Sequence, residues 1–435
     1  MKKSLLALAA LSAIAGAAQA QSSVTVYGIL DVGYVGGTTR ANSSATATNG
    51  GATKSTVNQF GESAEQTSRL GFKGTEDLGG GKSAFFTAEF YLYPQDTTLS
   101  GNANGGLLSR QTFVGLKQNG VGQAAFGLQY TPVFNAQAVT DAGMNNNIVG
   151  NVIYPSSTGI SNSYGTASAT GAQTNTAGET VRTANTLTIA SDKFAGFGVN
   201  AMYTLNNANS SQTANASTAA VNGATTIGGN TNASGWGLGA DYTYNKFYIT
   251  GAYQSLKALT TTTDANAATS QPWTNSGLGQ LGLVTTSAKG TISSSANSYP
   301  STQATNVTDN QGFVGATYDF GILKAYAQWI TRTATSTVDT SYYVKRQAEQ
   351  IGVRSYITPV VEAWATAGLG RYTAFGQNQP TANFNAWQLG SNYWLSKRTN
   401  LYAIYGQTIT SNSAAGTTTT SAGLSNYALG VRHTF

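Results

Sequence analysis

The sequence is dominated by short segments in which polar and apolar residues alternate, and this alternation limits the possible folds more than any other feature. In the stretch SRLGFKGTEDLGGGKSAFFTAEF at 68–90, Arg69 and Lys73 fall on one face of a strand. Leu70 and Phe72 fall on the other face. A glycine-rich turn, EDLGGG, then leads into a second alternating run. The pattern predicts a β-hairpin with one wet face and one apolar face.

The same alternation recurs along the chain in about sixteen segments of roughly ten residues, the length of a tilted strand that crosses a bilayer. Tight turns such as QNGVG and YNK alternate with long connections rich in Ser, Thr, Asn, Ala and Gly. This asymmetry is typical of a barrel with one end in the periplasm and the other outside the cell. The long connections are expected at 36–67, 132–182, 206–234, 258–310 and 411–424. The segments are 23–35, 68–77, 82–92, 109–119, 122–131, 183–192, 196–205, 235–245, 246–257, 311–320, 322–333, 347–358, 360–372, 384–395, 399–410 and 425–435.

The N-terminus has the form of a secretory signal peptide. Lys2 and Lys3 precede an apolar run at 5–18 that is too short to span a bilayer. Ala18-Gln19-Ala20 has the small-x-small form of a cleavage site. We therefore expect a leader at 1–20 and a barrel at 21–435.

The composition excludes several classes of protein. Charged residues make up 9% of the chain, far below the roughly 25% of an ordinary soluble domain. The chain has no cysteine, which argues against a disulfide scaffold despite the export signal. Removal of Lys2 and Lys3 lowers the formal net charge from +6 to +4, too little on this length to indicate nucleic acid as a partner.

A soluble β-sandwich would show similar alternation, so other features must separate it from a membrane barrel. The export signal, the lack of cysteine and the loop asymmetry favour the membrane barrel, as do aromatic residues near the strand ends. On the polar faces, Arg69, Lys73 and Glu89 need water, because unpaired buried charges are very costly. We therefore place these three side chains in a lumen, which a barrel of about sixteen strands makes wide enough to hold a water channel.

Enzyme sites find little support in the sequence. The only histidine is His433, close to the C-terminus, so a catalytic triad or a histidine metal site would have to be built there. Glu76 and Asp77 lie in a predicted turn, and Gly79-Gly80-Gly81 lacks the spacing of a phosphate-binding loop. We expect no enzymatic activity, no metal and no cofactor.

Six motifs that run from the first predicted strand to the last resemble one family. They are VTVYGILDVGY at 24–34, SRLGFKGTEDLGGG at 68–81, SRQTFVGL at 109–116, FGLQYTP at 126–132, KFAGFGVNAMYTL at 193–205 and the terminal YALGVRHTF. On these motifs the chain resembles the general diffusion porins of Gram-negative bacteria, especially the trimeric group of Burkholderia, Neisseria and other β-proteobacteria. The resemblance implies an all-β fold, a 16-stranded antiparallel barrel. It also implies a homotrimer in the outer membrane and a third extracellular loop that folds into the lumen as a constriction.

The resemblance also points to three arginines. Arg69 and Arg110 match wall arginines that face the constriction in porins, and Arg182 resembles the arginine before the sixth strand. Three arginines on adjacent lumenal surfaces would attract anions and reject cations. The alternative is that each arginine snorkels or pairs with a carboxylate for stability. Leu128 stands where related porins often carry a basic residue, so we expect a weakened positive cluster.

The connection at 132–182 carries only two acids, Asp141 and Glu179, and lacks the familiar P-E-F-G-G loop motif. If it folds inward, Asp141 is the better candidate to face the arginines, since Glu179 lies close to the sixth predicted strand. A solvated loop carboxylate without a role is an equally weighted alternative for Asp141.

The predicted function is passive diffusion of small hydrophilic solutes and ions through the outer membrane, with a weak anion preference. A substrate-specific outer-membrane channel is the alternative. A barrel adhesin is disfavoured because predicted strands start directly after the cleavage site and fill the chain. Expected partners are two further copies of the chain, outer-membrane lipid and lipopolysaccharide. The outer-membrane assembly machinery is also expected, since the terminal Phe435 resembles the signal that it recognises.

Overall fold

The fold is that of a computed structural model, which describes residues 23–43, 51–96, 98–100, 106–155, 176–211, 228–260, 285–286, 292–293, 307–336, 340, 343–375, 382–415 and 418–435. The predicted leader at 1–20 lies outside these residues. Within them, no helix is both long enough and apolar enough to cross a membrane.

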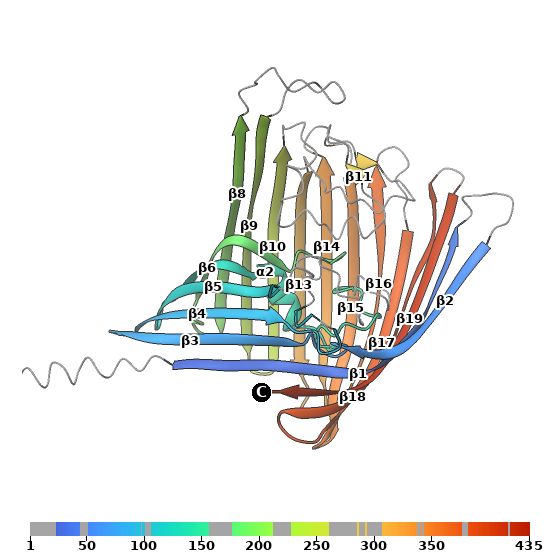
Figure 1. Cartoon of the computed structure of the whole chain (residues 1–435), viewed down its shortest axis with the longest axis horizontal. Helices are drawn as coiled ribbons and strands as arrows, with labels where there is room; N and C mark the ends of the chain where they lie inside the picture. Colours follow the sequence, from blue (N-terminus) through green and yellow to red (C-terminus); the bar gives the residue numbers. More distant parts are fainter. Residues whose placement is uncertain are drawn as a thin grey trace, which may run out of the picture.

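The alternating segments form strands of one antiparallel sheet (Figure 1). Two further strands, β11 (Thr285–Thr286) and β12 (Ile292–Ser293), pair only with each other. The described residues also include one short helix, α2 (Pro132–Ala138). The strands of the main sheet are β1 (Ser23–Ser43), β2 (Gly51–Glu62), β3 (Arg69–Gly79), β4 (Lys82–Tyr91), β5 (Ser109–Gln118), β6 (Gly122–Tyr130), β7 (Arg182–Ser191), β8 (Phe197–Ser211), β9 (Gly228–Tyr244), β10 (Phe247–Thr260), β13 (Val307–Asp319), β14 (Lys324–Ser336), β15 (Tyr343–Thr358), β16 (Val361–Phe375), β17 (Ala382–Trp394), β18 (Thr399–Ala415) and β19 (Thr418–Thr434).

The sheet closes on itself through β1. On one edge β1 pairs with β19, from Ile29↔Thr434 to Ser43↔Thr420. On the other edge its first part pairs with β3 and its second part with β2. Because β2 and β3 share one place in the ring, the 17 strands of the sheet form the closed 16-stranded barrel that the sequence predicts.

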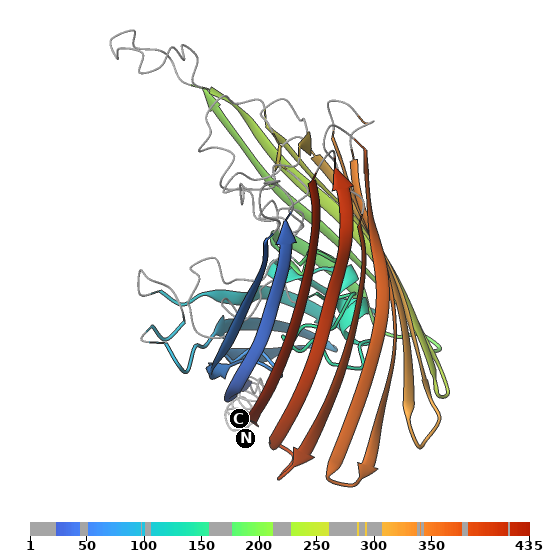
Figure 2. The same cartoon turned by 90° about the vertical axis from the view of Figure 1, so that its right-hand side faces the viewer.

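The two ends of the barrel differ as expected. Gly28 and Phe435 exchange two backbone hydrogen bonds of 3.0 and 3.1 Å, which brings the start of β1 and the end of β19 to the same rim. Figure 2 shows the C-terminus at the lower end of the barrel, where tight turns join the strands. In Figure 1 the near wall, β1 and β3 to β6, crosses the far wall steeply, as tilted barrel strands must.

The long connection predicted at 36–67 is wrong for most of its length. β1 continues to Ser43, and β2 occupies Gly51–Glu62. This segment lacks the alternation of polar and apolar residues, but its main chain pairs with β1 along its length and so forms a strand. For the same reason β8, β9, β18 and β19 extend into the connections predicted at 206–234 and 411–424.

Burial confirms which side chains of a strand face outward and which face inward. In β15, Ile351 is 68% exposed on the outer surface, whereas Gln350 is buried in the interior. In β14, Trp329 faces outward and Gln328 inward. The apolar side chains therefore form the outer belt, and the polar ones line the inside.

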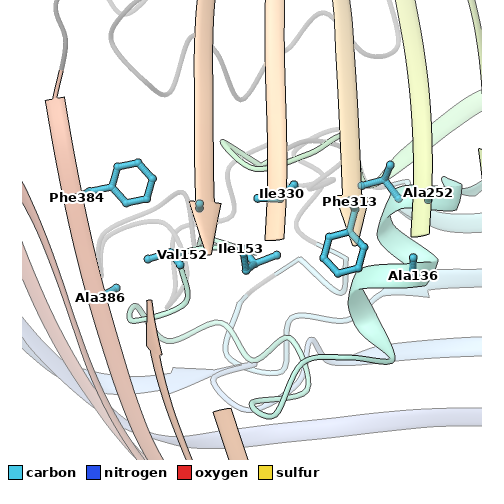
Figure 3. Packing of buried hydrophobic residues seen from close by; sticks show 10 residues of the cluster. Ala136, Val152, Ile153, Ala252, Phe313, Ile330, Phe384 and Ala386 are labelled. Carbon is cyan, nitrogen blue, oxygen red and sulfur yellow. The ribbon is translucent and has the colours of Figure 1, made fainter. Parts of the chain in front are cut away.

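The third long connection folds into the barrel, as the resemblance implies. We call its described parts, 131–155 and 176–181, the inward loop. Thr131 caps the helix α2, because its hydroxyl accepts the Phe134 N–H at 3.3 Å. Figure 3 shows how apolar side chains of the inward loop meet the inner wall. This buried cluster contains Val133, Ala136, Val152, Ile153, Ala252, Phe313, Ile330, Ala348, Phe384 and Ala386.

Candidate functional site

Two of the predicted arginines converge on a pair of tyrosines inside the barrel. The Arg110 guanidinium lies 4.6 Å from the ring centroid of Tyr91 and donates to the Tyr130 hydroxyl at 3.2 Å. The Arg182 guanidinium lies 5.5 Å from each of the two ring centroids and donates to the Tyr91 hydroxyl at 2.5 Å. The barrel brings these residues together because β4, β5, β6 and β7 are successive strands of one wall.

Arg69 joins this group from the start of β3. Its Nε donates to the Thr67 carbonyl at 2.9 Å, and its charge interacts with those of Arg110 and Glu89. Arg110 and Arg182 are almost fully buried, at 6% and 2% exposure, whereas Arg69 is only half-buried. We call these three residues the arginine cluster; Arg69 is the member that solvent reaches best.

Two further predicted residues adjoin the arginine cluster. Glu89 accepts the Arg110 Nε at 2.7 Å and the Tyr27 hydroxyl at 3.2 Å. The Lys73 ammonium group lies 5.3 Å from the Tyr27 ring centroid and is exposed. The group of Arg69, Lys73, Arg110, Arg182 and Glu89 therefore holds four cations and one carboxylate, so that this wall keeps a positive excess.

The structure places Asp141 elsewhere. Its carboxylate accepts hydrogen bonds from the backbone N–H groups of Asn145 (2.7 Å) and Gly143 (3.3 Å). It also accepts side-chain bonds from Asn151 at 3.1 Å and Gln350 at 3.3 Å. No described contact joins Asp141 to the arginine cluster; the charge that favours its ionised form is that of Arg354. Burial raises the pKa of Asp141, and the hydrogen bonds from Asn145 and Gly143 oppose that rise.

Glu179 is also turned away from the arginine cluster. It is fully buried, and within the described part of the chain neither of its carboxylate oxygens has a hydrogen-bond partner. Burial raises the pKa of Glu179 well above 4.5, and the charges of Arg332 and Arg346 offset only part of that rise.

The face that the inward loop turns to the lumen carries no charge. Asp141 is the only charged residue at 132–155, and it is buried. The large side chains exposed there are apolar, with Val139 at 52% and Met144 at 48% exposure. Charged side chains lie on both sides of this level of the lumen. The arginine cluster lies on the wall of β3 to β7, and Arg332 and Arg346, which donate to the Thr176 and Val152 carbonyls of the inward loop, lie on the wall behind the loop.

A second polar network on the opposite wall was not predicted. Arg354 donates to Glu362 through two bonds of 2.5 and 2.7 Å. Asn400 donates to Glu65 at 2.9 Å and accepts the Arg432 Nε at 3.0 Å. The only sequence signal for these residues is their place on the inward face of alternating strands, which does not distinguish a functional side chain from a structural one.

The chain is similar in sequence to known proteins. A family described as "Gram-negative porin" matches residues 7–413. Outer membrane porin protein 32 of Delftia acidovorans is 42% identical over 134 residues, which cover 30% of this chain and 33% of the relative. Major outer membrane protein P.IB of Neisseria gonorrhoeae is 37% identical over 153 residues, which cover 35% of this chain and 39% of the relative. The matched segments thus span 33% and 39% of the length of these two relatives.

Solved structures share the fold. An anion-selective porin from Comamonas acidovorans has a TM-score of 0.59 at 19% identity, with 95% of this chain and 100% of that chain covered. OmpT, an outer membrane protein of Vibrio cholerae, has a TM-score of 0.55 at 11% identity, with 95% and 98% covered. At these low sequence identities, the likeness shows the barrel fold alone.

Proposed function

Because this chain belongs to the Gram-negative porin family and is a protein of the outer membrane, we propose that it is a channel for the passive diffusion of small hydrophilic solutes and ions. The observation that carries the proposal is a polar barrel interior in which a positive wall faces the uncharged lumenal side of the inward loop. A solute that passes between them exchanges bulk water for a wet, charged lining, and no step in the passage requires an energy source.

The channel prefers anions, but weakly. Arg69 and Lys73 are accessible to a passing anion, whereas Arg110 and Arg182 act mainly through their field. Glu89 cancels one positive charge, and Leu128 adds none. A solved structure of the same fold is described as an anion-selective porin, which supports the sign of this preference.

The chain assembles as a homotrimer, after export with cleavage behind Ala20. A solved structure of the same fold is described as a trimer form. Its other partners are outer-membrane lipid, lipopolysaccharide and the assembly machinery, which we expect to recognise Phe435.

The first prediction tests the channel and its selectivity together. The purified protein should conduct in planar bilayers, with a reversal potential under a KCl gradient that favours chloride. Replacing Arg69 and Arg110 with Ser should shift that potential toward cations, because half of the four cationic groups are lost. The shift should weaken as salt screens the field over roughly 10 Å at 0.1 M.

The matched control is Lys397→Ser with Arg398→Ser, which removes the same two charges from an exposed turn at the end of the barrel. It should leave the reversal potential unchanged. An intact double variant with an unchanged reversal potential would show that the arginine cluster does not set selectivity, and a protein that never conducts would reject the channel itself.

A further inference from the structure

The two sides of the lumen at the level of the inward loop differ in chemical character. One side is the wall of the arginine cluster, where Arg69 is half-buried and the neighbouring Lys73 is exposed. The other side is the inward loop. Within its described part at 131–155, the exposed side chains are those of Asn135, Val139 and Met144. A solute that passes between the two sides therefore meets cationic groups on one side and mainly apolar groups on the other.

Val139 owes its position to the helix that precedes it. The face of α2 that packs on the wall carries Val133 and Ala136. Val139 forms the C-cap of the helix, one turn after Asn135, so these two residues lie on the opposite face. Val139 is therefore left half-exposed to the lumen.

Met144 reaches the lumen from a backbone conformation that glycine would adopt more easily. Its φ is 54° and that of Asn145 is 52°, both in the left-handed region. The Asn145 N–H donates to the Asp141 carboxylate at 2.7 Å, and the Asn145 and Gln137 side chains exchange hydrogen bonds of 2.8 and 2.9 Å. These bonds hold the turn and leave Met144 48% exposed. A long residue that is kept in a left-handed conformation points to a role for its side chain.

A carboxylate with an apolar ring can contact both sides at once. Its oxygens can accept hydrogen bonds from the Arg69 guanidinium, and its ring can pack on the Val139 and Met144 side chains. The methionine thioether also makes favourable contacts with aromatic rings. Asp141, the only carboxylate at 132–155, is buried, so the surface of the loop presents no charge of its own to the solute.

We propose that Val139 and Met144 form an apolar patch through which the channel favours one class of solute, organic anions that carry an apolar ring or chain. While such a solute passes, its carboxylate faces Arg69 and Lys73, and its apolar part contacts the patch. The inference rests on the proposed channel function and names the class of solute that the same site prefers. It separates this chain from a channel that sorts anions of equal charge by size alone.

The first test compares two anions of equal charge. Benzoate has an apolar ring, and shikimate has the same carbon skeleton with hydroxyl groups on it. Reversal potentials of the full-length trimer in planar bilayers, with chloride on the other side, give the permeability of each anion relative to chloride. We expect a higher permeability for benzoate. Val139→Thr with Met144→Gln keeps the size of both side chains and should lower the benzoate-to-shikimate ratio about fourfold, the factor for lost contact with roughly one methylene group.

The matched control is Val121→Thr with Leu395→Gln, which makes the same kind of change at exposed positions in tight turns outside the lumen. It should leave the ratio unchanged. In both variants the reversal potential under a KCl gradient should stay as in the unmodified channel, because no charge is altered. An unchanged benzoate-to-shikimate ratio in a well-folded Val139→Thr, Met144→Gln variant would overturn the proposal.

The second test asks whether Met144 is kept for stability or for its side chain. Glycine takes a φ of 54° without cost, so Met144→Gly should melt at the same temperature as the unmodified trimer or at a higher one. Its benzoate-to-shikimate ratio should nevertheless fall by about twofold or more. The control is Ala195→Gly, because Ala195 has a φ of 49° in an exposed turn, and its ratio should not change. A Met144→Gly trimer with a lower melting temperature and an unchanged ratio would leave Met144 a structural role only.

A binding measurement separates this proposal from that of the channel. A protein that never conducts would reject the channel, and saturation-transfer NMR would then follow benzoate at the detergent-solubilised trimer. A signal about twofold weaker or less in the Val139→Thr, Met144→Gln variant than in the unmodified trimer would support the apolar patch, and equal signals would reject it. If that variant does not fold, Met144→Gly takes its place in both measurements.

Discussion

At the scale of single residues, the arginine cluster shows how a positive charge can be kept inside a membrane protein. Arg110 and Arg182 place their planar groups against the rings of Tyr91 and Tyr130, and each also donates to a tyrosine hydroxyl. Cation–π contacts and hydrogen bonds together replace much of the lost hydration. Of the three arginines, the half-buried Arg69 is the one that solvent reaches best.

Glu89 gives a second residue-scale prediction. Glu89→Gln should shift the reversal potential further toward anions, because the only carboxylate of the group disappears. The amide can still accept from Arg110 and Tyr27, so the local geometry should survive. Glu76→Gln, in an exposed strand end, is the control and should have no effect. A shift toward cations in bilayer recordings would contradict the assignment.

Glu179 predicts a pH dependence of stability. Burial raises its pKa well above 4.5, so the folded protein binds a proton that the unfolded chain has already released. Stability should therefore fall as pH rises above the unfolded pKa, by up to about 1.4 kcal/mol per pH unit until the folded pKa is reached. In Glu179→Gln the heat-modification temperature should vary less with pH over that window. Equal pH slopes in the two proteins would argue that Glu179 does not titrate in this way.

At the scale of elements, α2 and β19 show that local sequence preference is not enough to hold a segment in place. A helix of seven residues is too short to be stable alone, so α2 depends on its Thr131 cap and on the wall that Val133 and Ala136 pack against. Thr131 also donates to the Thr180 carbonyl at 2.7 Å, which joins the two ends of the inward loop. β19 in turn depends on β1 and β18, its two neighbours in the ring.

Phe435 supplies the element-scale prediction. Deleting it removes the terminal aromatic and two backbone bonds to Gly28, so closure and insertion should both be impaired. The amount of heat-modifiable trimer in the outer membrane should fall several-fold, whereas Phe435→Tyr should keep most of it. Normal trimer levels after the deletion would show that Phe435 is not needed for closure or insertion.

At the scale of the whole molecule, the even number of strands places both ends of the chain at the same rim of the barrel. The chain ends lie at the rim with the tight turns, and the β8–β9 hairpin extends toward the opposite end in Figure 1. An even number of strands requires this arrangement. Among the described strands of the barrel, every one except β2 pairs on both sides, which protects the main chain from lipid.

Topology can be tested on intact cells. The connections at 206–234 and 258–310 are predicted to be extracellular, and their central parts, 212–227 and 261–284, lie outside the described residues. A cysteine placed in either central part should react with a membrane-impermeant reagent added to whole cells, because polar segments of low charge have no apolar face to bury. A cysteine in the turn at 120–121 should react only after the outer membrane is breached. Labelling of this turn, but not of the long connections, on intact cells would show that the barrel has the opposite orientation.

The sequence by itself determined the sixteen places in the ring and the side that each strand turns to lipid. These properties are local, because alternation follows from the strand period of two and repeats in every segment that crosses the bilayer. Family motifs added the inward fold of the third connection.

Only the tertiary structure decided the remainder. β2 carries no alternation, yet its main chain pairs with β1, Val57 packs against a buried cluster and Phe60 contacts Tyr34. Asp141 binds Gln350, 209 residues away, and Gln388 binds Asn146 across 242 residues. Such contacts exist only after the barrel has closed, because strands that are distant in sequence then surround the same loop and compete for its polar groups. The hydrogen-bond partner of each polar group in the loop therefore depends on the assembled wall, and no single segment of the sequence contains that information.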